Sequence, residues 1–120
     1  MKDEALQKAR VQAAVDDVLE ALNITYVDVK IKTNTKMDGD RTICETTTDW
    51  EYRQSVMDWC LPIVAVLTDL ELRRTAVHEA VHVIVAPMEM QVKDKDLANK
   101  LCELAVENVT RAILEVLPDA

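Results

Sequence analysis

The chain has 120 residues, of which 22 are acidic and 14 are basic, giving a formal charge of −8 at pH 7. Hydrophobic residues make up 49% of the sequence, yet it contains no Phe and aromatic residues reach only 3%, so a core has to be built from aliphatic side chains and Met. This length and apolar content predict one folded domain over residues 1–120 and argue against disorder. The acidic excess argues against nucleic acids and anionic membrane surfaces as partners, because both are negatively charged.

The sequence also bears on location and redox state. No stretch has the pattern of a signal peptide, and the most apolar run, residues 61–67, is too short to cross a bilayer. We therefore expect a cytoplasmic protein. The three cysteines are odd in number, widely spaced and lack a C-x-x-C pair, so we expect reduced thiols without a disulfide framework.

The first half of the chain changes from helical to strand-like periodicity. Apolar residues spaced three and four apart predict an amphipathic N-terminal helix that includes residues 11–22 and stops at Asn23. Strict alternation over residues 27–32 predicts a half-buried strand. We expect a hairpin or longer loop at Asp38-Gly39, then extended segments over residues 42–48 and about 50–59 with a turn near Asp49. The three strands are expected to form a small antiparallel sheet.

The second half reads as helical. Thr68 and Glu71 have the spacing of a capping box, which predicts the start of a helix. This helix should run through Ala86 and stop near Pro87, since a proline disfavours helical geometry in the residue before it. A last helix is predicted over residues 97–117, and the whole pattern indicates an α+β fold.

The sequence contains only two histidines, His78 and His82, which belong to an H-E-x-x-H motif within the predicted helix. Residues four apart on a helix project from the same face, so both imidazoles can reach one Zn²⁺ at roughly 2.0–2.1 Å. Glu79 would lie beside the metal, where a carboxylate can take a proton from a zinc-bound water and pass it to a leaving amine. Glu79 is also the only charged residue between positions 75 and 86, so protein should surround this helix on most sides. The motif predicts a zinc-dependent hydrolytic site with Glu79 as general base and acid.

Further features lie outside the motif: Thr75 three positions before it, uncharged flanks on both sides, and a Val-x-Arg-x-Ile pattern after Glu107. With them, the chain from Ile24 onwards resembles the smallest gluzincin-type zinc metallopeptidases, the minigluzincin-like proteins and similar phage-type enzymes. The resemblance implies a minimal zincin-like core, in which a short antiparallel sheet precedes the H-E-x-x-H helix and a later helix supplies a glutamate as third zinc ligand. It also implies a metallopeptidase that hydrolyses a peptide or protein substrate and that can be latent.

The third zinc ligand is the least determined part of this site. No other histidine is present, so a site with three protein ligands needs a carboxylate. Glu103 and Glu107 on the last predicted helix are four apart and share a face, so helical phase does not separate them. The resemblance favours Glu107 as the metal ligand. Glu103 lies nearer the spacing of larger gluzincins, and in that case Glu107 would orient a ligand histidine.

Two features are candidates for substrate contact. Tyr52 or Tyr26 could stabilise a developing oxyanion, a position that larger relatives fill with Tyr or His. A strand within residues 46–59 could pair with the backbone of a peptide as an exposed sheet edge. An ordinary edge protected by charged side chains explains the same residues equally well.

Other classes of function are compatible with the sequence. The chain could be a non-enzymatic interaction or scaffold protein with a structural or vestigial zinc site, whose first and last helices serve a partner or a homodimer. It could also be a regulatory protein that senses a metal through Cys and His. Without any metal, the two histidines would be satisfied by hydrogen bonds, and Glu79 would pair with Arg73 or Arg74.

Overall fold

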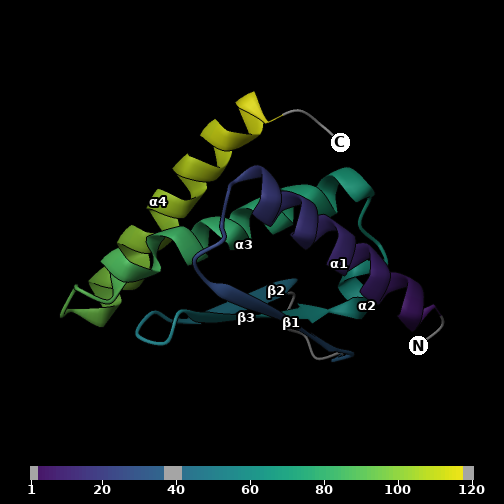
Figure 1. Cartoon of the computed structure of the whole chain (residues 1–120), viewed down its shortest axis with the longest axis horizontal. Helices are drawn as coiled ribbons and strands as arrows, with labels where there is room; N and C mark the ends of the chain where they lie inside the picture. Colours follow the sequence, from purple (N-terminus) through teal and green to yellow (C-terminus); the bar gives the residue numbers. More distant parts are fainter. Residues whose placement is uncertain (1–2, 37–41, 118–120) are drawn as a thin grey trace.

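The computed structural model describes residues 3–36 and 42–117. In chain order its elements are α1 (Glu4–Ala21), β1 (Asp28–Asn34), β2 (Cys44–Asp49), β3 (Gln54–Cys60), α2 (Leu61–Val64), α3 (Asp69–Glu89) and α4 (Lys95–Val116). Helices α1 and α3 lie on one side of the three-stranded sheet, and α4 packs on α3 at the edge of the molecule (Figure 1). The predicted α+β class is confirmed, whereas the expected loop at Asp38-Gly39 lies outside the described residues. Within the described ranges, no helix combines the length and hydrophobicity that a bilayer crossing requires.

The predicted end of α1 is confirmed. Asn23 adopts a left-handed conformation with φ of 56°, which Asn tolerates better than most residues. Its N–H donates to the carbonyl of Glu20, and the N–H of Ile24 donates to that of Leu19. These two bonds form a Schellman motif, which satisfies the last carbonyls of the helix.

The capping box at the start of α3 is also confirmed. The Glu71 N–H donates to Thr68 Oγ1 at 3.1 Å, and the Thr68 N–H donates to Glu71 Oε1 at 2.9 Å. The backbone donor at Thr68 lowers the pKa of the Glu71 carboxyl group. This pair fixes where α3 begins.

The predicted end of α3 is wrong by one turn. The helix continues through Pro87 to Glu89, and the Met90 N–H still donates to the carbonyl of Ala86. Proline removes only its own backbone donor, so the single carbonyl that loses its helical partner is that of Val83, four residues earlier. Packing of α4 against this turn, where the Cys102 thiol donates to Glu89, holds the extra residues in helical form.

The sheet is mixed, so the expected antiparallel sheet is wrong for one of its two strand pairs. β3 lies in the middle, parallel to β1 and antiparallel to β2. A hairpin between the first two strands would have made β1 and β2 neighbours. β3 takes the central place, and its inward side chains, Ser55, Met57 and Trp59, are almost completely buried. The third strand also begins later than expected, at Gln54, since residues 50–53 form the turn from β2.

The core lies between the sheet and helices α1 and α3. Met57 and Trp59 of β3 pack in one cluster with apolar side chains of both helices. On α3, the residues Val77, Ala80 and Val81 are fully buried in this cluster. Their burial fixes the rotation of α3 about its axis and leaves His78 and His82 on the flank that faces α4.

Candidate metal site

The two histidines and Glu79 come together on α3. One ligand atom from each of His78, Glu79 and His82 lies within 4.8 Å of the other two. The two imidazole rings are 5.0 Å apart between centroids and meet edge to face. Their proximity follows from the four-residue spacing on a helix. The predicted clustering of these three residues is therefore present in the fold.

Glu79 is held from the sheet side. Its side chain is only 5% exposed, and the hydroxyl of Thr46 on β2 donates to Oε1 at 2.8 Å. Burial raises the pKa of the Glu79 carboxyl group, while the Thr46 hydrogen bond and the two histidines oppose this shift. Burial and the nearby Glu79 charge also raise the pKa of the Cys44 thiol on the same strand. A carboxyl group with a raised pKa and one fixed oxygen is suited to accept a proton near neutral pH.

Two glutamates of α4 face the histidines, each opposite a different ring. Glu103 Oε1 is 3.3 Å from His82 Nε2, and Glu107 Oε1 is 3.7 Å from His78 Nδ1. The order is crossed, with the earlier glutamate at the later histidine, because α3 and α4 run in opposite directions. Glu107 also approaches the Arg111 guanidinium, at 3.8 Å from Oε2. Both carboxylates proposed from the sequence therefore lie at the histidine pair.

Two contacts at this site were not expected from the sequence. One is Thr46, which lies in a run of three threonines without alternation and whose contact with Glu79 depends on strand order. The other is Cys102, whose Sγ lies 4.0 Å from His82 Nδ1 and donates to Glu89 Oε2 at 3.3 Å. Burial is the largest cause that raises the pKa of the Cys102 thiol to about 12. The only sequence signal for Cys102 is its place directly before Glu103 on a helix predicted to face the site.

Cavities flank the histidine pair on both sides. One, of about 480 Å³, is lined by His78, Glu79 and Glu107 together with Cys44 and neighbouring side chains. The other, of about 260 Å³, is lined by His82 and Glu89 and by residues 46–48 of β2. Strand β2 contributes to both cavities. It pairs with β3 on one side only, so within the described residues its other edge has no strand partner.

The structure does not bring the two tyrosines to this site. The Tyr26 ring packs edge to face on Trp50, with 6.1 Å between centroids, and Tyr52 is exposed in the turn between β2 and β3. Neither residue lines the two cavities beside the histidines. Their proposed role in oxyanion stabilisation stays a prediction that this arrangement does not favour.

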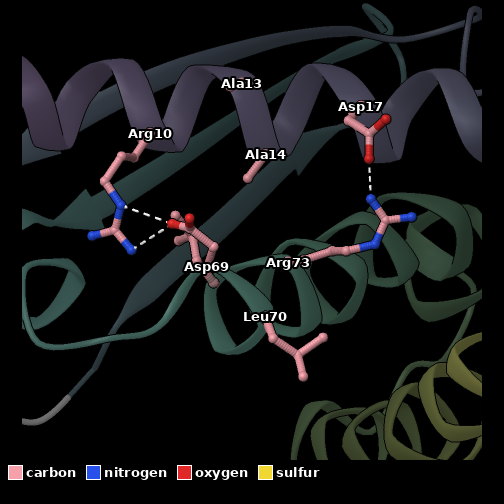
Figure 2. A pocket seen from close by; sticks show the side chains of 8 residues that line it. Arg10, Ala13, Ala14, Asp17, Asp69, Leu70 and Arg73 are labelled. Atoms are coloured by element: carbon pink, nitrogen blue, oxygen red, sulfur yellow. Dashed lines mark hydrogen bonds and ion pairs between the residues drawn. The ribbon is translucent and has the colours of Figure 1, made fainter. Parts of the chain in front are cut away.

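A further cavity, of about 460 Å³, lies between α1 and α3, and Figure 2 shows its side chains. Arg10 donates to Asp69 at 2.9 and 3.1 Å, and Arg73 pairs with Asp17. Arg10 also donates to the carbonyls of Val64 and Leu67. These contacts tie the two helices together. Arg73 thus has Asp17 of α1 as a partner, while the Glu79 carboxylate accepts from Thr46.

Comparison with protein-family models, with curated proteins and with solved structures finds no match to this chain. The resemblance to compact gluzincins thus stays an expectation, carried by the motif and the order of elements. Function has to be argued from the geometry of the site.

Proposed function

We propose that the chain is a small zinc-dependent metallopeptidase of the gluzincin type. The observation that carries the proposal is the opposition of two pairs. His78 and His82, one turn apart on α3, face Glu107 and Glu103, one turn apart on α4. Two imidazoles and one carboxylate are a ligand set found at catalytic zinc sites, which keep a fourth position open.

We assign Glu103 as the third ligand and Glu107 as the residue that orients His78. A ligand histidine binds zinc through one ring nitrogen and usually donates a hydrogen bond from the other to a carboxylate or carbonyl group. Glu107 lies at Nδ1 of His78, whereas Glu103 lies at Nε2 of His82. We take Nε2 as the metal-binding nitrogen of both histidines, so that Glu103 lies on the metal side and Glu107 accepts from the other nitrogen of His78. The charge of Glu103 is also among the causes that raise the pKa of Glu79. Glu107 as ligand, which the resemblance favoured, is the alternative.

Glu79 would carry the proton transfers. Zinc bound at this site would lower the pKa of a water molecule and polarise a substrate carbonyl group. Thr46 occupies Oε1 of Glu79, which leaves Oε2 to take the water proton and deliver it to the leaving amine. Burial raises the pKa of Glu79 and thereby makes its carboxylate a better base.

A peptide is the substrate that the surroundings fit best. Strand β2 borders both cavities beside the histidines and has one unpaired edge. A peptide added along this edge would form main-chain hydrogen bonds with β2. Its backbone would then pass close to Glu79 and the histidine pair.

A non-enzymatic protein with a structural or vestigial zinc site is the second candidate. The deep burial of Glu79 and its hydrogen bond to Thr46 favour it, because the same features would hold a closed, inactive site together. A latent enzyme would share this geometry. The two candidates differ in turnover and share metal binding.

Measurement of the zinc content tests the metal site, and measurement of peptide hydrolysis tests the proposed activity. We expect one zinc per chain in the purified protein, and its loss in the double variant His78→Ala, His82→Ala. Glu79→Gln should retain zinc and abolish hydrolysis, while Glu115→Gln, an exposed change elsewhere on α4, should alter neither. A wild-type chain without bound zinc in zinc-containing buffer would refute the metal site. Zinc without turnover on a mixed peptide library would favour the scaffold.

A further inference from the structure

Helix α4 presents three different faces. Its buried face, formed by Ala98, Cys102, Val106 and Thr110, packs on α3. A second flank carries Glu103 and Glu107 toward the histidines. The third face is apolar and exposed, and its members are Leu97, Leu101, Leu104, Ala105, Val109, Ala112 and Val116. Nothing in the described fold covers this third face, which we call the α4 stripe.

The α4 stripe continues onto α3. Met88 is 73% exposed, and together with Val85 it borders a shallow apolar cavity of about 210 Å³ that also contacts Leu101 and Ala105. Leu101 and Leu104 are themselves 51% and 60% exposed. The two helices therefore share one contiguous apolar surface.

The size of this surface fits a protein interface. The stripe and Met88 leave on the order of 600 Å² exposed, which is at the upper end of the largest apolar patch on a typical monomer. A stable interface buries about 800 Å² per partner, of which about 65% is apolar in homodimers. The exposed apolar area is thus about what one side of a homodimer needs.

We propose that a second copy of this chain covers the α4 stripe, with the two α4 helices antiparallel about a two-fold axis. The stripe is self-complementary when mirrored about the midpoint between residues 106 and 107. In that register Leu97 lies opposite Val116, Leu101 opposite Ala112, and Leu104 opposite Val109, while Ala105 lies opposite the polar Asn108. Three apolar pairs thus span about 30 Å of helix, and in each a Leu faces a smaller Val or Ala. In a two-fold symmetric dimer the same patch of both subunits forms the interface, and the α4 stripe can fill that role.

Charge bears on the choice of face and on the direction. Each chain carries −8, so net charge opposes association, and this repulsion is smallest at a surface poor in acidic groups. The residues of the stripe are uncharged, and Glu115 lies beside them, five turns after Leu97. A parallel pair in register would bring Arg111 against Arg111 and Glu115 against Glu115 at the rim of the stripe. The antiparallel pair separates these like charges along the helix.

Sedimentation equilibrium of the full chain tests the proposal with and without a zinc chelator, since neither zinc nor hydrolysis is assumed. We expect twice the chain mass of 13.6 kDa for the wild type and the single mass for Leu101→Glu, Leu104→Glu with unchanged helix content. The milder Leu101→Ala, Leu104→Ala variant should raise the dissociation constant by on the order of 100-fold or more. Val66→Glu, at a site 80% exposed between α2 and α3, is the matched control and should stay dimeric.

Two cysteine variants test the direction. Leu97→Cys with Val116→Cys should form a disulfide-linked dimer on mild oxidation, whereas Leu97→Cys alone should not. A wild-type chain that is monomeric at millimolar concentration would overturn the proposal, whether or not a different protein binds the stripe. A dimer that persists in both leucine variants would show that a different face of the chain forms the interface. Cross-linking of Leu97→Cys alone would show that the two α4 helices are not antiparallel in this register.

Discussion

Replacement of each α4 glutamate by glutamine separates a zinc ligand from a residue that only orients one. The change is nearly isosteric and removes the negative charge. In the proposed arrangement Glu103→Gln removes one of three protein ligands, and Glu107→Gln removes the partner of His78 Nδ1. The two variants should therefore lose zinc affinity to different extents.

The magnitudes follow from the two roles. Zinc sites with four ligands bind with about 10–16 kcal/mol, or about 2.5–4 kcal/mol per ligand, so loss of Glu103 should weaken binding by about 70- to 900-fold. Partners that orient a ligand are worth about 10–100-fold in metal affinity. Loss of Glu107, 3.7 Å from its ring nitrogen, should fall within that range. Glu103→Gln is thus expected to be the weaker binder by roughly tenfold.

Competition for zinc against a chromogenic chelator at pH 7.5 measures both affinities on one scale. Glu115→Gln serves as the control for loss of one negative charge from α4, and its affinity should match the wild type. If Glu107→Gln proves the weaker binder, the assignment from ring nitrogens is wrong and Glu107 is the ligand. Wild-type affinity in both variants would show that α4 supplies no ligand.

The ion pairs, the buried carboxylate and the metal site should each alter unfolding. Arg10→Met should lower the free energy of urea unfolding by about 2 kcal/mol, because two backbone carbonyls lose their donor. Asp69→Asn, at a side chain 92% exposed, should cost less than about 1 kcal/mol, and equal effects would refute this reasoning. Without zinc, the raised pKa of Glu79 means that the free energy of unfolding of the wild type falls as pH rises from 4.5 through that pKa. Glu79→Gln lacks this loss, so its stability should increase relative to the wild type over the same interval. Urea titrations at several pH values measure the difference between the two proteins, and a difference that does not change with pH would refute this reasoning. Zinc at 100 times its dissociation constant should raise the melting temperature by about 10 °C by scanning calorimetry, and a shift that survives the double histidine substitution would place the metal elsewhere.

The helices were predictable because their signals are local. Apolar spacing placed α1, α3 and α4, Asn23 marked the end of α1, and the Thr68–Glu71 box marked the start of α3. Each of these signals acts within one or two helical turns. The clustering of His78, Glu79 and His82 was predictable for the same reason, since helix geometry alone brings them together.

The sheet and the contacts across it were not predictable, because they depend on pairing between distant segments. Alternation over residues 27–32 showed which side chains of β1 face inward, but it carries no information about which strand lies beside which. The short helix α2 was also missed, since four residues including Pro62 give no helical period. The contacts of Thr46 with Glu79 and of Cys102 with His82 join residues 33 and 20 positions apart, and neither follows from local spacing.

The strand order that sequence could not supply is also what would let a peptide reach the proposed site. With β1 and β2 as neighbours in a simple meander, β2 would lie in the middle of the sheet, with both edges paired. Insertion of β3 between them moves β2 to the outside while its inward side chain Thr46 still meets α3. Within the described residues, one strand thus holds the Glu79 carboxylate and keeps a backbone edge unpaired beside it. The proposed peptidase function depends on this crossover as much as on the H-E-x-x-H motif, because the motif would supply two metal ligands and the base but no surface along which a substrate could align.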